Sequence, residues 1–531
     1  MKPIKQIKLF YLPALFAILV VLVMFSPSWA ATYYVDATDG NNNNDGLSQS
    51  TAWKTIAKVN SSIFQPGDAI LFKRGETWRE QLRVPSSGRE GNPITFSAYG
   101  SGDKPVIKGS DIIAIWSIEG SYVNLRKATV NTEPFAVWED GSRLTKQTSR
   151  QNVEDNTGSW YWNANILYVR SSSGIPGSNS KEYEACQRIN SVMVPTKSYL
   201  TFDNLEIVEG GNTTSGVQFY VSAGSSNLTI QSCDFSRSAT KHISLWALDG
   251  DAWIRDCSFS YTGECRIPAI GYTWSAIWIG TASPSNHTVT VERSRFEHIA
   301  DYIGDQYQSH GIYVTGGRLV YRYNYHLGGV QSGAAVRMAG NVKDGCEIYY
   351  NLITGGDAWN SWGIYNANGS GHLVYNNVFF NVSRVVIQDS GPNGNGNGIT
   401  AKNNIFYLKN IGHKIFDITS NLDTFVSDYN VFFIESEANF TFFWDQNYIS
   451  GLDNWMNVSG QDTHSKNANP FFKNLSVKDF SLQATSPCID AGTNLGLTLD
   501  FNGNLVPRGE MPDIGTFEYG GLAAPKNLHI Y

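Results

Sequence analysis

Five segments of the chain share one pattern: LVYRYNYH (319–326), CEIYYNLI (346–353), LVYNNVFF (373–380), TAKNNIFY (400–407) and VSDYNVFF (426–433). Each begins with a strand-like run that leads to an Asn, and apolar residues follow it. The anchor residues Asn324, Asn351, Asn377, Asn404 and Asn430 are spaced by 27, 26, 27 and 26 residues. A constant period in this range predicts a solenoid in which every coil contributes the same position.

The Asn positions indicate how the coils stack. Stacked β-coils lie about 4.8 Å apart, and a turn Asn both donates and accepts hydrogen bonds along such a stack. Asn is a poor strand residue, so its recurrence at one position favours a ladder of stacked turns. Three earlier segments fit the same frame, with Cys233, Cys257 and Ser294 at the anchor position.

A second strand follows each turn, and its alternation separates two faces. The inward positions are expected to be Val217, Ile243, Ile277, Ile312, Val336 and Ile364. The residue after each then points outward, which gives a column of Gln218, Ser244, Trp278, Tyr313, Arg337 and Tyr365.

The ends and the interruptions of the repeat predict the domain organisation. Residues 1–30 read as a signal peptide, with Lys2, Lys5 and Lys8 before an apolar run and a small-x-small cleavage site ending at Ala30. The remaining chain divides into an N-terminal cap with the first coils (31–110), a β-rich insertion (111–190), a central β-helix (191–435), C-terminal coils with a cap (436–520), and a linker or tail (521–531). We therefore expect a secreted monomer, extracellular or periplasmic, with no membrane association after signal removal.

Local patterns add detail within these domains. Apolar residues at helical spacing predict a capping helix over residues 50–63, with Trp53, Ile56 and Val59 on or near one face. Strands are expected at 69–73, 82–84, 94–98 and 106–108. The segment GSWYWNANILYVRSSSG (158–174) is typical of a β-hairpin.

Charge and cysteine content exclude some functions. The formal net charge is −7, from 40 Lys and Arg against 47 Asp and Glu, which argues against a nucleic-acid partner. The six cysteines form no CxxC pair, so a zinc site is not expected. Cys257 and Cys265 either close a small loop or are buried apolar residues, and both interpretations stay open.

Side chains suited to sugars gather on the coils between residues 216 and 390. Aromatic rings and planar hydrogen-bonding groups on a flat face match the CH faces and hydroxyl edges of a polysaccharide. Residues at these coils give substrate-binding candidates: His242, Trp246, Trp278, Trp362, Tyr365 and Arg384. The catalytic candidates are His310, Tyr313, Arg337 and Asp305, with Arg337 clamping a carboxylate and His310 or Tyr313 moving a proton. A carboxylate of the preceding loop, Asp301 or Asp305, is expected to raise the pKa of His310.

Other carboxylates support different chemistry. Glu264, Asp301, Asp305, Asp357 and Asp389 follow strands or lie in loops, and two that face each other would suit glycoside hydrolysis. The sequences DGNNNNDG (39–46) and DFNGN (500–504) place oxygen side chains at short spacing but lack a complete calcium-loop pattern. We interpret both as Asx-rich turns; Ca²⁺ is the one cofactor that this pattern leaves open.

These motifs resemble the secreted bacterial right-handed parallel β-helix proteins of the pectin-lyase-like superfamily. The resemblance rests on YYVDATDGNNNNDGLSQSTAWKTIAKVN and FQPGDAILFKRGETW near the start, and on SPCIDAG and PDIGTFEY near the end. The hairpin resembles an insertion of β-helix glycoside hydrolases. The resemblance implies an all-β, right-handed parallel β-helix. It leaves the activity open, because the superfamily includes lyases, hydrolases, epimerases and binding proteins. The outer column derived above contains no carboxylate, unlike the face of calcium-dependent pectate lyases.

The sequence thus leaves three functions. The first is a polysaccharide lyase that acts on a uronate-containing glycan by β-elimination, through Arg337 with His310 or Tyr313. The second is a glycoside hydrolase that uses loop carboxylates such as Asp305 and Asp357. The third is a noncatalytic carbohydrate-binding or surface protein. The basic and aromatic outer column favours the first, and the hairpin insertion favours the second.

Overall fold

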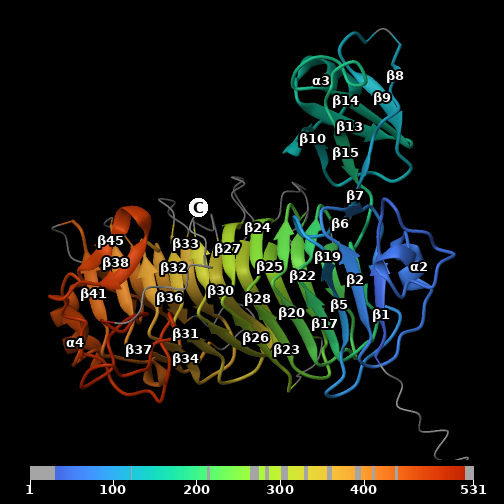
Figure 1. Cartoon of the computed structure of the whole chain (residues 1–531). Helices are drawn as coiled ribbons and strands as arrows, with labels where there is room; N and C mark the ends of the chain where they lie inside the picture. The colour runs from blue at the N-terminus through green and yellow to red at the C-terminus, as the bar shows by residue number, and fades with distance from the viewer. Residues whose placement is uncertain are drawn as a thin grey trace, which may run out of the picture.

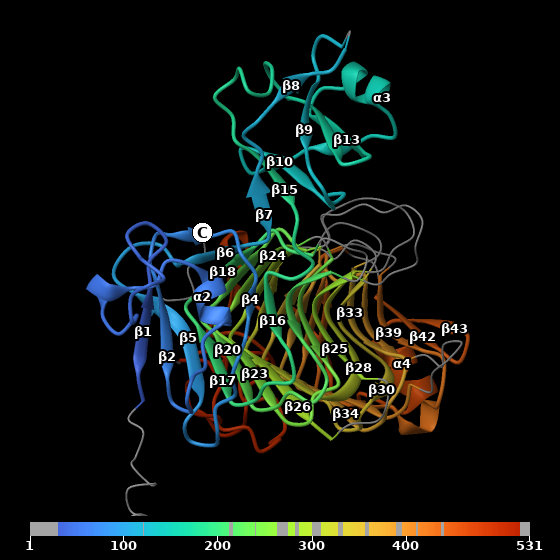
Figure 2. The ribbon, with the colours of Figure 1, turned by 90° about the vertical axis from the view of Figure 1, so that its right-hand side faces the viewer.

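The computed structural model describes residues 30–120, 122–211, 216–238, 240–262, 274–281, 286–299, 309–327, 333–355, 361–388, 396–409, 413–436 and 440–520. Three long parallel sheets wind around one apolar interior and form a right-handed parallel β-helix (Figures 1 and 2). The fold expected from the 26- and 27-residue period is confirmed.

Sheet A runs the length of the β-helix. Its strands pair in this order: β1 (Thr32–Val35), β2 (Ala69–Lys73), β5 (Ile94–Tyr99), β17 (Leu200–Asp203), β20 (Leu228–Gln231), β23 (Ala252–Arg255), β26 (Thr288–Glu292), β28 (Ser309–Arg322), β31 (Glu347–Tyr349), β34 (His372–Tyr375), β37 (Ile399–Lys402) and β40 (Val426–Asp428).

Sheet B follows the Asn turn of each coil. Its strands are β3 (Thr77–Trp78), β6 (Val106–Lys108), β18 (Glu206–Val208), β21 (Asp234–Ser236), β24 (Ser258–Thr262), β27 (Arg295–Ile299), β29 (Tyr325–Leu327), β32 (Leu352–Thr354), β35 (Val378–Phe380), β38 (Ile405–Leu408), β41 (Val431–Ile434) and β44 (Lys466–Asn467).

Sheet C carries the second strand of each repeat. It comprises β4 (Leu82–Arg83), β16 (Val192–Val194), β19 (Val217–Val221), β22 (Lys241–Trp246), β25 (Trp274–Gly280), the first part of β28, β30 (Gly333–Val342), β33 (Ser361–Asn366), β36 (Arg384–Gln388), β39 (Lys414–Ile418) and β42 (Thr441–Trp444), with β43 (Asn447–Ser450) antiparallel at its end. The predicted strands near residues 69–108 are confirmed as β2, β4, β5 and β6.

The predicted Asn ladder is present between sheets A and B. Asn351 Nδ2 donates to Asn377 Oδ1 at 3.0 Å, and Asn377 Nδ2 donates to Asn404 Oδ1 at 3.1 Å. The same oxygens accept backbone N–H groups of the preceding coil, and the links from Asn324 and to Asn430 repeat this arrangement. Each amide therefore satisfies buried backbone and the next amide together.

The residue before each ladder Asn has left-handed backbone. Its φ is 57° at Tyr323, 52° at Tyr350 and 58° at Tyr429. This conformation costs a bulky residue about 1 kcal/mol, and it turns the chain so that the Asn points inward. At the C-terminal end the buried carboxylate of Asp462 accepts from Asn430 Nδ2 at 3.0 Å and closes the ladder.

Aromatic rings stack along the interior in step with the coils. Phe235, Phe259 and Phe296 form one stack with centroid distances of 5.1 and 4.9 Å. Phe379 and Phe406 continue the pattern at 5.4 Å. The same position holds His326 and Ile353 in the two coils between Phe296 and Phe379. The core is thus a one-dimensional repeat of flat or apolar side chains, in which each coil packs on its neighbours.

The period-breaking stretch forms two small sheets, antiparallel except for the β12–β13 pair, that project from the N-terminal half of the β-helix (Figures 1 and 2). One sheet contains β7 (Ser110–Ile112), β15 (Tyr183–Cys186), β10 (Val137–Glu139) and β11 (Ser142–Arg143). The other contains β8 (Ser117–Ile118), β9 (Arg126–Thr129), β14 (Ile166–Arg170), β13 (Ser159–Asn163) and β12 (Thr145–Lys146), with α3 (Arg150–Asp155) beside it. The expected hairpin is the antiparallel pair β13–β14.

The N-terminal helix is shorter than expected. A 3₁₀ turn η1 (Gln49–Thr51) and the helix α2 (Ile56–Asn60) replace the predicted helix over 50–63. The Asn42 side chain accepts the backbone N–H groups of Lys54 and Thr55, which holds that stretch out of a helix. Trp53 instead forms a bridge with Val35, and it is buried in the main core together with Ile56 and Val59.

The helix α4 (Leu452–Ser459) closes the other end of the β-helix, where Leu452 and Trp455 join the main core. The pair β45 (Phe472–Asn474) and β46 (Asp479–Leu482) instead packs on outward side chains of sheet B, including Leu352, Val378 and Tyr407. The 3₁₀ turn η2 (Leu422–Thr424) lies between β39 and β40, and η3 (Leu475–Val477) lies between β45 and β46. The predicted signal peptide, apart from Ala30, and the predicted tail over 521–531 lie outside the described residues. No helix among the described residues is long and apolar enough to cross a bilayer.

Candidate functional site

The outer face of sheet C carries one continuous column of side chains. Strand pairing aligns Tyr220, Ser244, Trp278, Tyr313, Arg337, Tyr365, Ile387, Asp417 and Phe443. The predicted outer column is confirmed from Ser244 to Tyr365. It is wrong at Gln218, because Tyr220 pairs with Ser244; likewise Phe219, rather than Val217, pairs with Ile243.

The column also corrects the expectation that this face lacks a carboxylate. Ile387 on β36 lies one coil beyond Tyr365, and Asp417 on β39 pairs with Ile387 in the next coil. The signal was in the sequence, because the segment KIFDIT continues the same alternation, with Phe416 inward beside Val386 and Asp417 outward.

Arg337 lies between two tyrosine rings on this face. Its guanidinium carbon is 5.2 Å from the ring centroid of Tyr313 and 5.1 Å from that of Tyr365. Both rings come from neighbouring coils in the same register, so the parallel stacking that builds the sheet also builds the sandwich. Cation–π contact holds the planar cation in place at the surface, where it can present N–H groups to an anionic ligand.

His310 lies beneath this sandwich and is fully buried. Its Nδ1 accepts the backbone N–H of Ala334 at 3.0 Å, so the neutral ring carries its proton on Nε2. Arg337 Nη1 lies 3.3 Å from His310 Nε2. Both nitrogens carry protons in this tautomer, so we regard the contact as packing and not as a hydrogen bond. Burial and the Arg337 charge hold the pKa of His310 well below its usual value. The expected increase is therefore wrong, and His310 is neutral at pH 7.

His242 does not lie on the outer face. It is fully buried, with ring centroids 6.2 Å from Phe235 and 5.9 Å from Phe259, and its Nδ1 is 2.6 Å from Gln218 Oε1. On β22 two successive residues, His242 and Ile243, point inward. Strict alternation predicts that only Ile243 does so, and it therefore places His242 on the wrong face. Burial lowers the pKa of His242 to about 3. Its assignment to substrate binding is corrected, because no part of the ring reaches the surface.

A second aromatic group lies toward the N-terminal coils. The rings of Trp246 and Trp278 are 5.2 Å apart, and Lys241 Nζ lies 5.4 Å from the Trp278 centroid. Trp278 Nε1 donates to Thr315 Oγ1 at 3.1 Å. Burial lowers the pKa of Lys241 to about 8. Lys241 was not singled out from the sequence, because an isolated Lys at the start of a strand carries no pattern.

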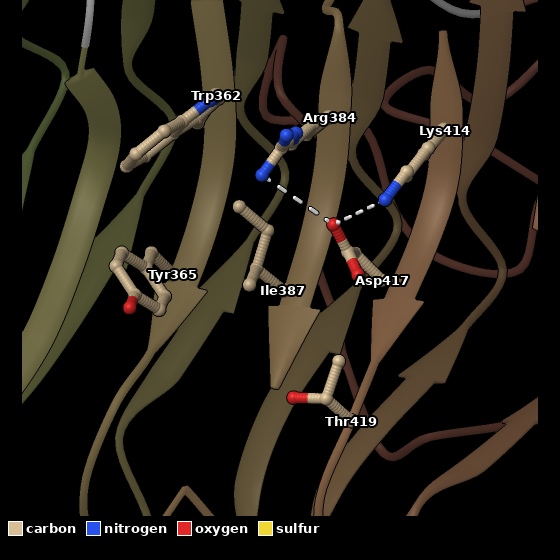
Figure 3. A pocket seen from close by; sticks show the side chains of 7 residues that line it. All are labelled: Trp362, Tyr365, Arg384, Ile387, Lys414, Asp417 and Thr419. Atoms are coloured by element: carbon tan, nitrogen blue, oxygen red, sulfur yellow. Dashed lines mark hydrogen bonds and ion pairs between the residues drawn. The ribbon is translucent and has the colours of Figure 1, made fainter. Parts of the chain in front are cut away.

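A pocket of about 250 Å³ opens at the C-terminal part of the face, over β33, β36 and β39 (Figure 3). Its lining residues are Trp362, Tyr365, Arg384, Ile387, Lys414, Asp417 and Thr419. The rings of Trp362 and Tyr365 stand at 90° with centroids 5.5 Å apart. The sequence identified the two aromatic residues and Arg384, and it missed Lys414, Asp417 and Thr419.

The charged groups of the pocket form a chain across two strands. Asp417 Oδ2 is 3.5 Å from Arg384 Nη1 and 3.2 Å from Lys414 Nζ (Figure 3). Arg384 also lies over the Trp362 ring at 5.8 Å, and Lys414 lies over the Phe443 ring at 4.0 Å. Two cations around one carboxylate leave the pocket with a net positive charge.

The remaining carboxylate candidates, Asp305, Glu264, Asp301, Asp357 and Asp389, lie outside the described residues, as does Cys265. Cys257 is a buried free cysteine.

The candidate calcium segments are Asx turns. Asn41 Oδ1 accepts the Asn43 N–H, Asp45 Oδ1 accepts the Leu47 N–H, and Asp500 Oδ1 accepts from Asn502 and Asn504. These turns use the side-chain oxygens on backbone N–H groups. The described part of the chain holds no cluster of three or more His, Cys, Asp or Glu side chains arranged for a metal ion.

Comparisons with known proteins support the fold. No protein-family model matches the chain. A stretch of 98 residues is 37% identical to a lacto-N-biosidase of Bifidobacterium longum subsp. longum; it makes up 18% of this chain and only 6% of that protein's length.

Two solved structures superpose on 76% of the chain. One is XylC in complex with xylose, with a TM-score of 0.50, 12% identity and 83% of that chain covered. The other is a glycoside hydrolase, with a TM-score of 0.50, 10% identity and 93% covered. At these identities the likeness shows the fold alone.

Proposed function

We propose that this protein binds a uronate-containing polysaccharide along the outer face of sheet C and cleaves it by β-elimination. The observation that carries the proposal is the Arg337 guanidinium held between Tyr313 and Tyr365 on that face. Three further cations, Lys241, Arg384 and Lys414, flank it along the coils, and Asp417 is the carboxylate of the outer column. A row of cations and aromatic faces suits a glycan that carries carboxylates.

The chemistry assigns a role to each group near Arg337. Arg337 pairs with the carboxylate of the sugar and so stabilises the negative charge that develops when the neighbouring ring carbon loses its proton. Tyr313, whose ring packs on Arg337, takes that proton as its phenolate, which the neighbouring guanidinium charge stabilises, and becomes a neutral phenol. The electron pair forms a carbon–carbon double bond, and the glycosidic oxygen leaves with a proton from a second donor. Asp305, in the segment before β28, is the candidate donor in its protonated form.

His310 takes a different role from the one expected from the sequence. A fully buried ring cannot contact a sugar, and its Nδ1 is already occupied by the Ala334 N–H. We assign His310 as a positioning residue that supports the Arg337 guanidinium from below. Trp246 and Trp278 then supply a stacking platform further along the face.

The comparisons support a glycan substrate for this proposal. The solved structures that share the fold are named for xylose binding and glycoside hydrolysis. A signal peptide at residues 1–30 would export the protein to where such polymers occur.

The test is a screen of purified protein on neutral and uronic polysaccharides. A lyase generates an unsaturated product with new ultraviolet absorbance. Arg337→Ala is expected to lower kcat/KM at least about a hundredfold, because it removes the group that stabilises the developing charge. Tyr313→Phe is expected to lower kcat by a similar factor.

The control is Arg293→Gln, on the turn after sheet A, where Arg293 pairs with Asp256 at 2.9 Å. This variant should retain wild-type activity. Near-normal turnover of the true substrate by both Arg337→Ala and Tyr313→Phe would rule out this reactive centre.

The second candidate is a glycoside hydrolase, which the 37% identity to a lacto-N-biosidase favours. Asp417 would then act with a carboxylate of the segments around Asp305 or Asp357. New reducing ends without new ultraviolet absorbance, together with loss of activity in Asp417→Asn, would favour the hydrolase over the lyase.

A further inference from the structure

We propose that the pocket over β33, β36 and β39 is a separate subsite for one acidic sugar unit, whose carboxylate pairs with Arg384. This inference rests on the proposed function, because it names a second contact with the same glycan. The pocket volume of about 250 Å³ is small beside the usual range for larger ligands, about 300–1,000 Å³. It therefore suits a single ring rather than a longer segment.

The walls of the pocket match a sugar ring. Trp362 and Tyr365 meet at a right angle with their centroids 5.5 Å apart, so they form a corner with two aromatic faces (Figure 3). One face can stack on the CH side of a pyranose while the other closes an edge. Ile387 and Thr419 complete the lining between the aromatic corner and the charged groups.

The charges select for a carboxylate-bearing ring. Lys414 is already paired with other groups of the protein, because its Nζ contacts Asp417 and the rings of Phe443 and Tyr448 and its side chain is only 14% exposed. Asp417 is 7% exposed, whereas Arg384 is 42% exposed. Asp417 thus orients Arg384 from one side, and the rest of the guanidinium faces the pocket. Asp417 is one carboxylate shared by two cations, so a neutral sugar would leave the remaining positive charge of the pocket uncompensated, and an acidic sugar binds better.

The pocket and the proposed reactive centre at Arg337 share one residue. Tyr365 packs on the Arg337 guanidinium and also lines the pocket. Arg337 on β30 is in register with Ile387 on β36, two coil steps away, and Arg384 lies three residues before Ile387 on the same strand. The two arginine positions are therefore about 14 Å apart, from about 10 Å across the coils and about 10 Å along the strand. They can contact two carboxylates a few sugar units apart on one glycan chain. This favours a polyuronate over a glycan with isolated acidic units.

The experiment measures binding of monosaccharides by calorimetry, with D-glucuronate and D-galacturonate as acidic probes and D-glucose and D-galactose as neutral ones. It uses the full chain carrying Arg337→Ala, so that the pocket is measured without the central guanidinium. Acidic sugars should bind at least about tenfold more tightly than their neutral counterparts, the range expected for a charge-assisted contact. Adding Arg384→Gln should remove this preference.

The matched control adds Arg293→Gln instead of Arg384→Gln. Arg293 has the same 42% side-chain exposure and also pairs with an aspartate, but it lies outside sheet C. It should leave sugar binding unchanged, and equal thermal midpoints of the variants show that each is folded. Equal affinity for acidic and neutral sugars, or less than a twofold effect of Arg384→Gln, would overturn the subsite. Because binding is read without turnover, the subsite can fail while the lyase proposal stands, and the reverse also holds.

Discussion

Replacing Asn377 by Ala tests whether the Asn ladder stabilises the fold or merely accompanies it. Asn377 Nδ2 donates to Ile348 O at 2.9 Å and to Asn404 Oδ1 at 3.1 Å, and its Oδ1 accepts two N–H groups of Asn351 at 3.0 Å. Every partner is buried, and the Ala variant loses four hydrogen bonds, although Asn404 Oδ1 keeps the backbone N–H of residue 377 and Asn351 Nδ2 keeps Tyr321 O. Each lost hydrogen bond contributes about 1 kcal/mol. We expect the free energy of unfolding to fall by about 4 kcal/mol.

The assay is guanidinium unfolding followed by tryptophan fluorescence, with the shift of the midpoint converted through the measured m-value. The matched control is Asn457→Ala at an exposed position of α4, where Ala is the better helix former and the change should stay within about 0.5 kcal/mol. A loss in Asn377→Ala that is within 1 kcal/mol of this control would refute the view that the ladder amides carry stability.

Two further changes follow from local geometry. In Gly311→Ala, the added Cβ would lie 2.3 Å from His326 Cε1 and 2.7 Å from Ala335 O; overpacking should lower the thermal midpoint and cost about 1–3 kcal/mol, and an unchanged midpoint would contradict this packing. Burial and the nearby Glu184 carboxylate raise the pKa of Glu209 to about 7, above its unfolded value near 4.5. The folded chain thus holds a proton that the unfolded chain releases, so this contribution is complete below pH 4.5 and is lost as the pH rises through 7. Thermal midpoints between pH 5 and 8 should fall less steeply in Glu209→Gln than in the wild type, and equal slopes would exclude this role.

The sequence predicted the features that repeat and missed those that occur once. The ladder residues and the outer column from Ser244 to Tyr365 recur at each coil, so their spacing alone reveals them. The inward turn of His242 was not predictable, because it depends on a second inward residue that alternation does not encode. The short helix α2 is a tertiary effect, since Asn42 captures the backbone at Lys54.

The candidate site shows the same division. The register of the coils predicted that Arg337 and Tyr313 lie side by side, and the Arg337 guanidinium carbon is 5.2 Å from the Tyr313 ring centroid. Asp417 was missed although its alternation was readable, because the column was followed only as far as Tyr365. The low pKa of His310 was not predictable, because it depends on the depth of burial and on the contact with Arg337.

The identical links of the Asn ladder have a consequence for how such a protein can change in evolution. Each link joins one coil to the next by the same two hydrogen bonds, from the backbone N–H and the Nδ2 of one Asn to the Oδ1 of the next. At the C-terminal end Asp462 and Ser465 accept these two bonds instead. Inserting or deleting one whole coil of 26 or 27 residues would therefore leave every link intact. A coil added between β30 and β36 would move Arg384 away from Arg337 by one strand spacing, about 4.8 Å. Under the proposed function, the number of coils between the two arginines would then set which spacing of acidic units on a glycan they fit, without a change at either position.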